Sequence, residues 1–323
     1  MPELIEHPIQ LKSTDVTQSS KTIRILLVWI DKYFDQFLEV PNFKNQKLQN
    51  ISFNYLNELA IFFYALKGSI SKQSADPWIV DWFDSRLAKL ENHLIFFDKK
   101  IKWNELKIQV KERPDILKAF LFQPLLMNAI QHLAESNFTI LHSLLDAHEF
   151  EQDEISQMDY VFLKDLFFQK ESDQYFLNQL GKIYRELDGQ LAKGGIVDLY
   201  DVTHLIFFGT KFGNTVLPNI EKHFPKIKNE LFQAATKQIT IGDYDIGAEL
   251  LLSLFYIEKK ITDKIFSLLK QLINAVQDED LPIVNTRNND RTTGGNFRAK
   301  YHPILIVTMT LISAYCLFPK MKK

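Results

Sequence analysis

Cysteine is nearly absent from this chain of 323 residues, which contains only Cys316. A single cysteine excludes an internal disulfide and any zinc site built from several thiolates. Glycine and proline are also scarce, with 11 of each, which argues against a turn-rich β protein of this length. The 38 basic residues nearly balance the 40 acidic ones, so no excess of positive charge would draw the chain to nucleic acid or to an anionic membrane.

Recognisable motifs of catalysis and targeting are missing as well. The sequence has no P-loop or G-x-G-x-x-G nucleotide motif, no G-x-S-x-G, H-E-x-x-H or C-x-x-C motif, and no DDxxD cluster. Residues 1–20 lack the basic-then-apolar order of a secretory signal, and we expect a flexible segment there in a cytoplasmic protein. The longest uncharged run, Tyr301–Phe318, is marginal in length for a membrane span, so we expect a buried helix rather than a membrane anchor.

What the chain does have is helical periodicity and many apolar residues, 46% in all, including 26 Phe. Apolar residues recur at helical spacing along almost every patterned segment, which predicts an all-α protein with a single domain over residues 21–323. In the second half, helices that are apolar on all sides alternate with amphipathic ones, as in an inner ring of buried helices inside an outer ring. This order predicts an α/α toroid, with an open helical-repeat solenoid as the alternative. The predicted helices cover residues 22–40, 51–66, 77–94, 101–112, 114–121, 124–136, 138–148, 157–169, 173–188, 199–211, 217–236 (split at Pro225), 244–257, 261–277 and 302–318.

Three of the apolar helices begin alike, with Tyr200-Asp201, Tyr244-Asp245 and Tyr301-His302. The second residues of these pairs are separated by 44 and then by 57 residues. A period of this size made of two helices is typical of a stacked helical-hairpin array, in which equivalent positions lie along one rim. We therefore expect Asp201, Asp245 and His302 to converge at that rim.

The chemistry of these three residues favours a divalent metal ion. Two carboxylates and one imidazole form an oxygen and nitrogen ligand set that suits Zn²⁺ or Fe²⁺. The alternative for Asp201 and Asp245 is helix capping, because Asp is among the preferred N-cap residues. His302 argues for the metal, since histidine is a poor N-cap but a common metal ligand.

Neighbouring side chains extend the predicted site. His204 follows Asp201 by one helical turn, and Glu249 follows Asp245 by one helical turn. Both lie within apolar helices, and a lone carboxylate such as that of Glu249 is costly to bury there. We expect His204 and Glu249 to act as catalytic acid or base. The alternatives are a hydrogen-bonded core histidine for His204 and a partner that orients a histidine for Glu249. We expect substrate contacts from the rim residues Tyr200, Tyr244 and Tyr301 and from Arg291 and Arg298 of the loop 277–300. For the two arginines the alternative is a solvated loop without a binding role.

The blocks YDVTHLIFFGTKFG, DYDIGAELLLSLF and KYHPILIVTMTLISAY resemble an uncharacterised family of bacterial helical proteins. The resemblance covers residues 195–318 and implies a likeness to the α/α-toroid group, which includes terpene cyclases and the β subunit of protein prenyltransferases. The last block is similar to the final repeat of that subunit, where a Tyr-His pair opens an inner helix and the histidine binds zinc, a role that the resemblance assigns to His302. The prenyltransferase site also needs a cysteine two residues after its Asp, whereas Asp245 is followed by Ile246-Gly247, so the toroid is better supported than prenyl or terpene chemistry.

These observations lead us to expect an enzyme with a toroid cavity. It would be metal-dependent and would act on a small-molecule or peptide substrate in specialised natural-product biosynthesis. The alternative is a non-catalytic protein that binds a peptide or a partner enzyme of a biosynthetic complex, because helical arrays supply concave binding surfaces without chemistry. Neither expectation involves nucleic acid, a membrane or a nucleotide cofactor.

Overall fold

The structure is a computed structural model that describes residues 12–39, 54–72, 75–100, 108, 143–146, 157–168, 172–276 and 297–318. Every regular element in these ranges is a helix, so the prediction of an all-α protein is confirmed there. Apart from residues 108 and 143–146, the helices predicted between residues 101 and 148 lie outside the described ranges. The helices are α1 (Ser13–Phe37), α2 (Asn54–Lys72), α3 (Pro77–Lys100), α7 (Met158–Phe168), α8 (Asp173–Glu186), η3 (Leu191–Lys193), α9 (Ile196–Gly209), α10 (Ile220–His223), α11 (Ile227–Thr240), α12 (Tyr244–Glu258), α13 (Asp263–Ala275) and α14 (Phe297–Leu317).

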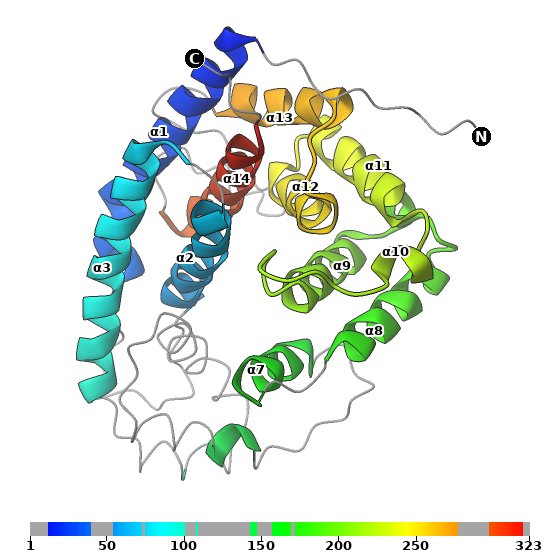
Figure 1. The fold of residues 1–323 in the computed structure, drawn as a ribbon, viewed down its shortest axis with the longest axis horizontal. Helices are drawn as coiled ribbons and strands as arrows, with labels where there is room; N and C mark the ends of the chain where they lie inside the picture. Colours follow the sequence, from blue (N-terminus) through cyan, green and yellow to red (C-terminus); the bar gives the residue numbers. More distant parts are fainter. Residues whose placement is uncertain are drawn as a thin grey trace.

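The helices lie in two layers (Figure 1). Helices α2, α14, α12, α9 and α7 lie toward the middle of the molecule, and α3, α1, α13, α11 and α8 lie outside them. The sequence explains which layer a helix takes, because α12 buries 12 of its 15 residues whereas α13 buries one stripe of six. The predicted alternation of apolar and amphipathic helices in the second half therefore corresponds to inner and outer positions.

The C-terminal helix packs against the N-terminal helices. Helix α14 contacts α1 and α2 as well as α12, and α1 also contacts α13. Phe297, the first residue of α14, anchors this packing, since its ring centroid lies 5.1 Å from that of Tyr55 on α2 and 5.7 Å from that of Tyr33 on α1. The two ends of the described chain thus meet at the helix that carries His302.

Helix α14 is the one described helix that is long and apolar enough to cross a membrane. Its window Lys300–Leu317 has a mean hydropathy of 1.2, and 67% of that window is buried inside the protein. Neighbouring helices rather than lipid cover most of its apolar surface. The segment therefore fits the buried inner helix expected from the sequence.

The sequence predicted the break at Pro225 correctly but not the start of α1. Helix α1 begins at Ser13 rather than at residue 22, so residues 13–20, expected to be flexible, form its first turns. A polar contact holds this start, because the Asp15 carboxylate lies 2.9 Å from Lys270 Nζ on α13. In contrast, the split at Pro225 is confirmed, since this residue lies between α10 and α11.

Candidate metal centre

The acidic residues and the histidine singled out by the sequence do not cap their helices. The N-cap of α12 is Asp243, whose carboxylate accepts a backbone N–H of the first turn at 3.4 Å. The N-cap of α9 is Gly195, so Asp201 lies in the second turn of that helix. His302 also lies in the second turn of its helix, α14. The capping interpretation is therefore wrong, and another role has to explain these side chains.

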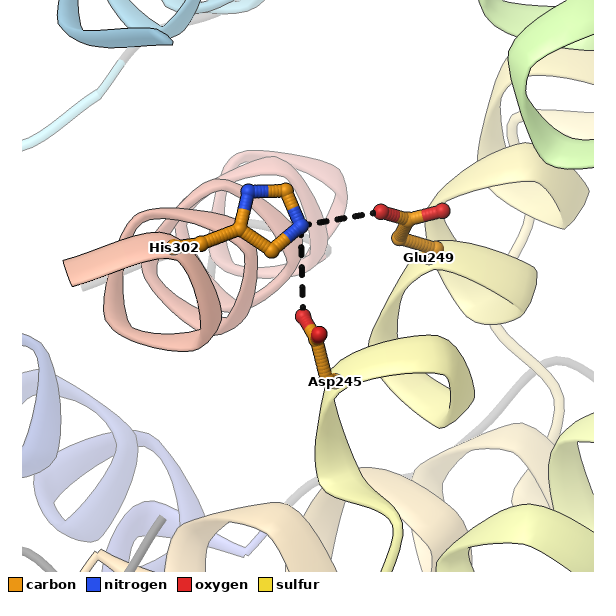
Figure 2. A group of neighbouring side chains, drawn as sticks. All are labelled: Asp245, Glu249 and His302. Atoms are coloured by element: carbon orange, nitrogen blue, oxygen red, sulfur yellow. Dashed lines mark ion pairs between the residues drawn. The ribbon is translucent and has the colours of Figure 1, made fainter. Parts of the chain in front are cut away.

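Helices α12 and α14 bring three ionisable side chains together (Figure 2). Asp245 and Glu249 are four residues apart on α12, so they lie on one face of that helix, one turn apart. His302 points at this face, with its Nε2 3.5 Å from Asp245 Oδ1 and 3.3 Å from Glu249 Oε1. Both carboxylates are buried, whereas the His302 side chain is 29% exposed. The group is thus accessible from the imidazole side.

Hydroxyl groups of α9 fix the outer oxygens of both carboxylates. Tyr200 Oη donates a hydrogen bond to Asp245 Oδ2 at 2.6 Å. Thr203 Oγ1 donates to Glu249 Oε2 at 2.5 Å. Because these bonds hold the outer oxygens, the other oxygen of each carboxylate is directed toward His302 Nε2.

A third carboxylate, from α2, holds the other side of the imidazole. Glu58 Oε2 lies 2.7 Å from His302 Nδ1 and accepts its proton, because an ionised carboxylate has only acceptors. Tyr301 Oη donates to Glu58 Oε1 at 3.1 Å and holds that carboxylate in place. Metal-binding histidines are oriented in the same way, by a carboxylate on the nitrogen that does not bind the metal.

Burial and the crowding of negative charge shift the pKa values of this group. Burial alone would lower the pKa of His302, but the charges of Glu58 and Asp245 outweigh it and raise that pKa well above its usual value. Burial raises the pKa of Asp245 to about 6, against the opposing effect of His302. Burial and the charge of Glu58 also raise the pKa of Tyr301. The group therefore favours a positive charge at its centre, which either a proton on Nε2 or a metal ion would supply.

The distances within the group fit a metal ion. Two ligands that each bind a tetrahedral Zn²⁺ at about 2.1 Å lie about 3.4 Å apart. The observed distances from His302 Nε2 are 3.5 and 3.3 Å, and the three ligand atoms all lie within 4.8 Å of one another. Glu249 Oε1 is buried and accepts no hydrogen bond from the described residues. Its neighbour at 3.3 Å is His302 Nε2, so either a proton on that nitrogen or a metal ion between the two atoms would satisfy it.

A cavity of about 220 Å³ lies beside the three candidate ligands. Glu249 and His302 form part of its surface, so a molecule in the cavity would adjoin the centre. Its other polar lining residues are Glu58, Asp159 and His204. Its apolar wall consists of Ile61, Phe207, Phe208, Phe212, Leu305, Ile306 and Met309.

The structure places Asp201 apart from the residues with which the sequence grouped it. Within the described ranges, the group that offers ligands is Asp245, Glu249 and His302, and Asp201 is not in it. Adjacent residues of a helix point about 100° apart, so Tyr200 and Asp201 cannot both face α12. Burial raises the pKa of Asp201, whose charged neighbours are His204 and Asp198. Glu249, expected as a catalytic acid or base, lies in this group of candidate ligands in place of Asp201.

The residues expected to contact substrate lie in several places. Tyr200 and Tyr301 hold carboxylates of the centre and are not part of the described cavity lining. Tyr244 is half-buried at the start of α12 and is also outside that lining. Arg291 lies outside the described residues, and Arg298 lies in the first turn of α14 with its side chain outside them.

Sequence reasoning missed Glu58 and Thr203. Glu58 is the one acidic residue in the apolar segment 54–66, which is the same signal that singled out Glu249. Thr203 gave no comparable signal, because a buried threonine is satisfied by a carbonyl of its own helix in most contexts. Its role follows only from the placement of α12 beside α9.

Comparison with known proteins identifies a family for most of the chain. A family model described as "Domain of unknown function (DUF6895)" matches residues 103–312. This match contains α9, α12 and most of α14, with the three candidate ligands, whereas Glu58 precedes it. No curated protein and no solved structure matches the chain. The match is consistent with the resemblance to an uncharacterised family, and the likeness to terpene cyclases and prenyltransferases stays a prediction.

Proposed function

The chain belongs to the DUF6895 family, and we propose that it is a metal-dependent enzyme acting on a small-molecule or peptide substrate. The observation that carries this proposal is the convergence of Asp245 Oδ1, Glu249 Oε1 and His302 Nε2. Each of the three side chains is held by a hydrogen bond to its outer atom, which leaves the inner atom facing a common point. Ligands oriented by second partners in this way are typical of metal sites.

The ligand set favours Zn²⁺ or Fe²⁺. Asp245 and Glu249 supply oxygen and His302 supplies nitrogen, a combination that both ions accept. Three protein ligands leave a fourth tetrahedral position, which is characteristic of catalytic rather than structural zinc sites. A bound ion would supply Lewis acidity and lower the pKa of a bound water. His204, on the cavity wall, is placed to hold or move a proton near a substrate.

We further propose that the two layers of helices close into an α/α toroid. Support comes from the packing of α14 against α1 and α2, which joins the two ends of the described chain. In an open solenoid each repeat contacts only its neighbours, so the first and last repeats stay apart. The candidate ligands lie on the inner helices α12 and α14, and Glu58 lies on the inner helix α2 (Figure 1).

Cobalt substitution tests the proposed function, because the visible absorption of Co²⁺ reports its coordination. Titration of metal-free protein should give an absorption that saturates at one ion per chain. Glu249→Gln should weaken this binding by roughly tenfold or more, since it removes a charged ligand. Acetohydroxamate should then change the spectrum of the wild-type complex by occupying an exchangeable position.

Two outcomes would contradict the proposal in different ways. Absence of Co²⁺ binding would overturn the metal centre itself. A bound Co²⁺ whose spectrum does not respond to acetohydroxamate would indicate a closed, structural site. That second result would favour the non-catalytic binding protein as the function of the cavity.

A further inference from the structure

The cavity beside the centre has the size of a compact apolar group. Its volume of about 220 Å³ exceeds the roughly 150 Å³ in which an engineered apolar cavity holds benzene. Seven of the described residues that line it are apolar, and three of these are phenylalanines. An aromatic ring or a branched alkyl group would fill this space and exclude water from the wall.

The charge of the cavity is negative whether or not a metal ion is bound. Glu58, Asp159 and Glu249 line it, and Asp245 lies one turn before Glu249 on the same face of α12. Among the described side chains of this group, the positive charge beside these four carboxylates is one imidazolium of His302, or one divalent ion in place of its Nε2 proton. Either cation leaves the sum negative, so the preference for a positive ligand does not depend on the state of the centre.

No lysine or arginine among the described residues lines the cavity. Lys211, which precedes the lining residue Phe212, is turned to Asp165, with Nζ 3.1 Å from Oδ1. Anion-binding cavities present guanidinium or ammonium groups, or backbone N–H groups at a helix N-terminus, to the ligand. This lining presents carboxylates instead, next to phenylalanine rings that attract cations.

We infer that the cavity binds a primary amine, in its ammonium form, that carries a compact apolar group, and that it rejects carboxylates, phosphates and diphosphates of the same shape. This inference rests on the proposed function in one respect, since the metal centre is where such a substrate would react. The binding selectivity itself rests only on the cavity lining. The metal centre and the binding selectivity can therefore be disproved separately.

A matched series of one-ring probes tests this selectivity on chelator-treated, metal-free protein. Benzylamine, benzyl alcohol and benzoate share a ring and differ in charge, and their dissociation constants follow from ligand-observed NMR titration. Benzylamine should bind roughly tenfold more tightly than benzyl alcohol, and benzoate should bind least. Benzyl alcohol or benzoate binding as tightly as benzylamine would overturn the inference, as would absence of binding by all three probes.

A charge-removing variant locates the effect in the cavity. Asp159→Asn should weaken benzylamine binding by roughly fivefold and leave benzyl alcohol unchanged, because it removes a negative charge from the lining and keeps the size of the side chain. Glu186→Gln removes the same charge from an exposed position on α8 and should change neither constant. Equal losses for amine and alcohol in Asp159→Asn would contradict the assignment. Selective amine binding without Co²⁺ binding would retain this inference and reject the metal enzyme.

Discussion

Glu58, Asp245 and Glu249 surround one imidazole ring, that of His302. Removing carboxylates from water is costly, and several around one ring also repel each other. Hydroxyl donors from Tyr200 and Tyr301 offset part of this cost. Clusters of this kind are frequent where chemistry or ion binding requires them, which is why we place the candidate site at this group and not in the surrounding core.

Thr203 should affect the centre only through Glu249. Thr203→Val keeps the shape of the side chain but removes the donor to Glu249 Oε2, so Co²⁺ affinity should fall by roughly tenfold. Thr308→Val is the matched control, because Thr308 is equally buried and its hydroxyl donates to Ile304 O within α14. Equal affinities in the two variants would show that Thr203 does not position the ligand.

Glu58 should act through His302 Nδ1. Glu58→Gln removes the charge that orients and activates the imidazole, and Co²⁺ affinity should fall by roughly 10- to 100-fold. Tyr301→Phe removes only the hydroxyl that holds Glu58, so it should cause a smaller loss. A larger loss from Tyr301→Phe than from Glu58→Gln would mean that the carboxylate charge is not what matters. Isothermal titration calorimetry with Co²⁺ measures the affinity of each variant.

At the scale of single residues, the sequence predicted part of the candidate centre. Asp245 and His302 stand out because the repeated Tyr-Asp and Tyr-His pairs mark equivalent positions, and Glu249 because it interrupts an apolar helix. The inclusion of Asp201 depended on the same repeat, which does not specify how far each helix is rotated. Glu58 reaches the group from more than 180 residues away, a contact that no local pattern encodes.

At the scale of elements, close packing of α12 on α11 sets the position of both carboxylates. Gly247 lies between Asp245 and Glu249, and a Cβ added there would come within 2.6 Å of Ile239 Cγ1 on α11. Only glycine therefore allows α12 to approach α11 this closely. The backbone between the two carboxylates is fixed by a contact on the face opposite the centre.

Two Gly→Ala variants should have opposite effects on stability. Gly247→Ala should lower the free energy of unfolding by about 1–3 kcal/mol, because the new methyl group overpacks the α11 contact. Gly181→Ala on α8 should raise it by about 0.5–1 kcal/mol, since the nearest atom would lie 3.4 Å away and alanine favours a helix. Urea denaturation of both measures the difference. Stabilisation by Gly247→Ala would contradict the packing of α12 on α11.

The sequence predicted which elements exist better than where they begin. Periodicity identified α12 and the break at Pro225, because both are local properties. It placed the starts of α1 and α14 too late, since their first turns carry polar residues. Tertiary contacts stabilise those turns, such as Asp15 with Lys270 and Phe297 with Tyr55, and local composition cannot reveal them.

At the scale of the whole molecule, ring closure should show in the overall dimensions. A compact chain of this length has a radius of gyration of about 20 Å, whereas an open solenoid is more extended. Small-angle X-ray scattering of the full chain should therefore give a value near about 20 Å. A clearly larger value together with an elongated distance distribution would contradict the toroid.

The alternation of inner and outer helices could be predicted from the sequence, because burial on all sides and burial of one stripe give different patterns. The choice between a closed toroid and an open solenoid depends on the contacts of α14 with α1 and α2 at the opposite end of the chain, which no local pattern encodes. Those contacts also place Glu58 beside His302. The same packing that joins the chain ends thus completes the candidate centre.

The central claim is that Asp245, Glu249 and His302 hold a metal ion, and elemental mass spectrometry of untagged protein tests it most directly. The account predicts close to one Zn or Fe per chain in the wild type and in Asp201→Asn, and almost none in His302→Gln. A wild-type protein without metal, or equal metal contents in the wild type and His302→Gln, would contradict it.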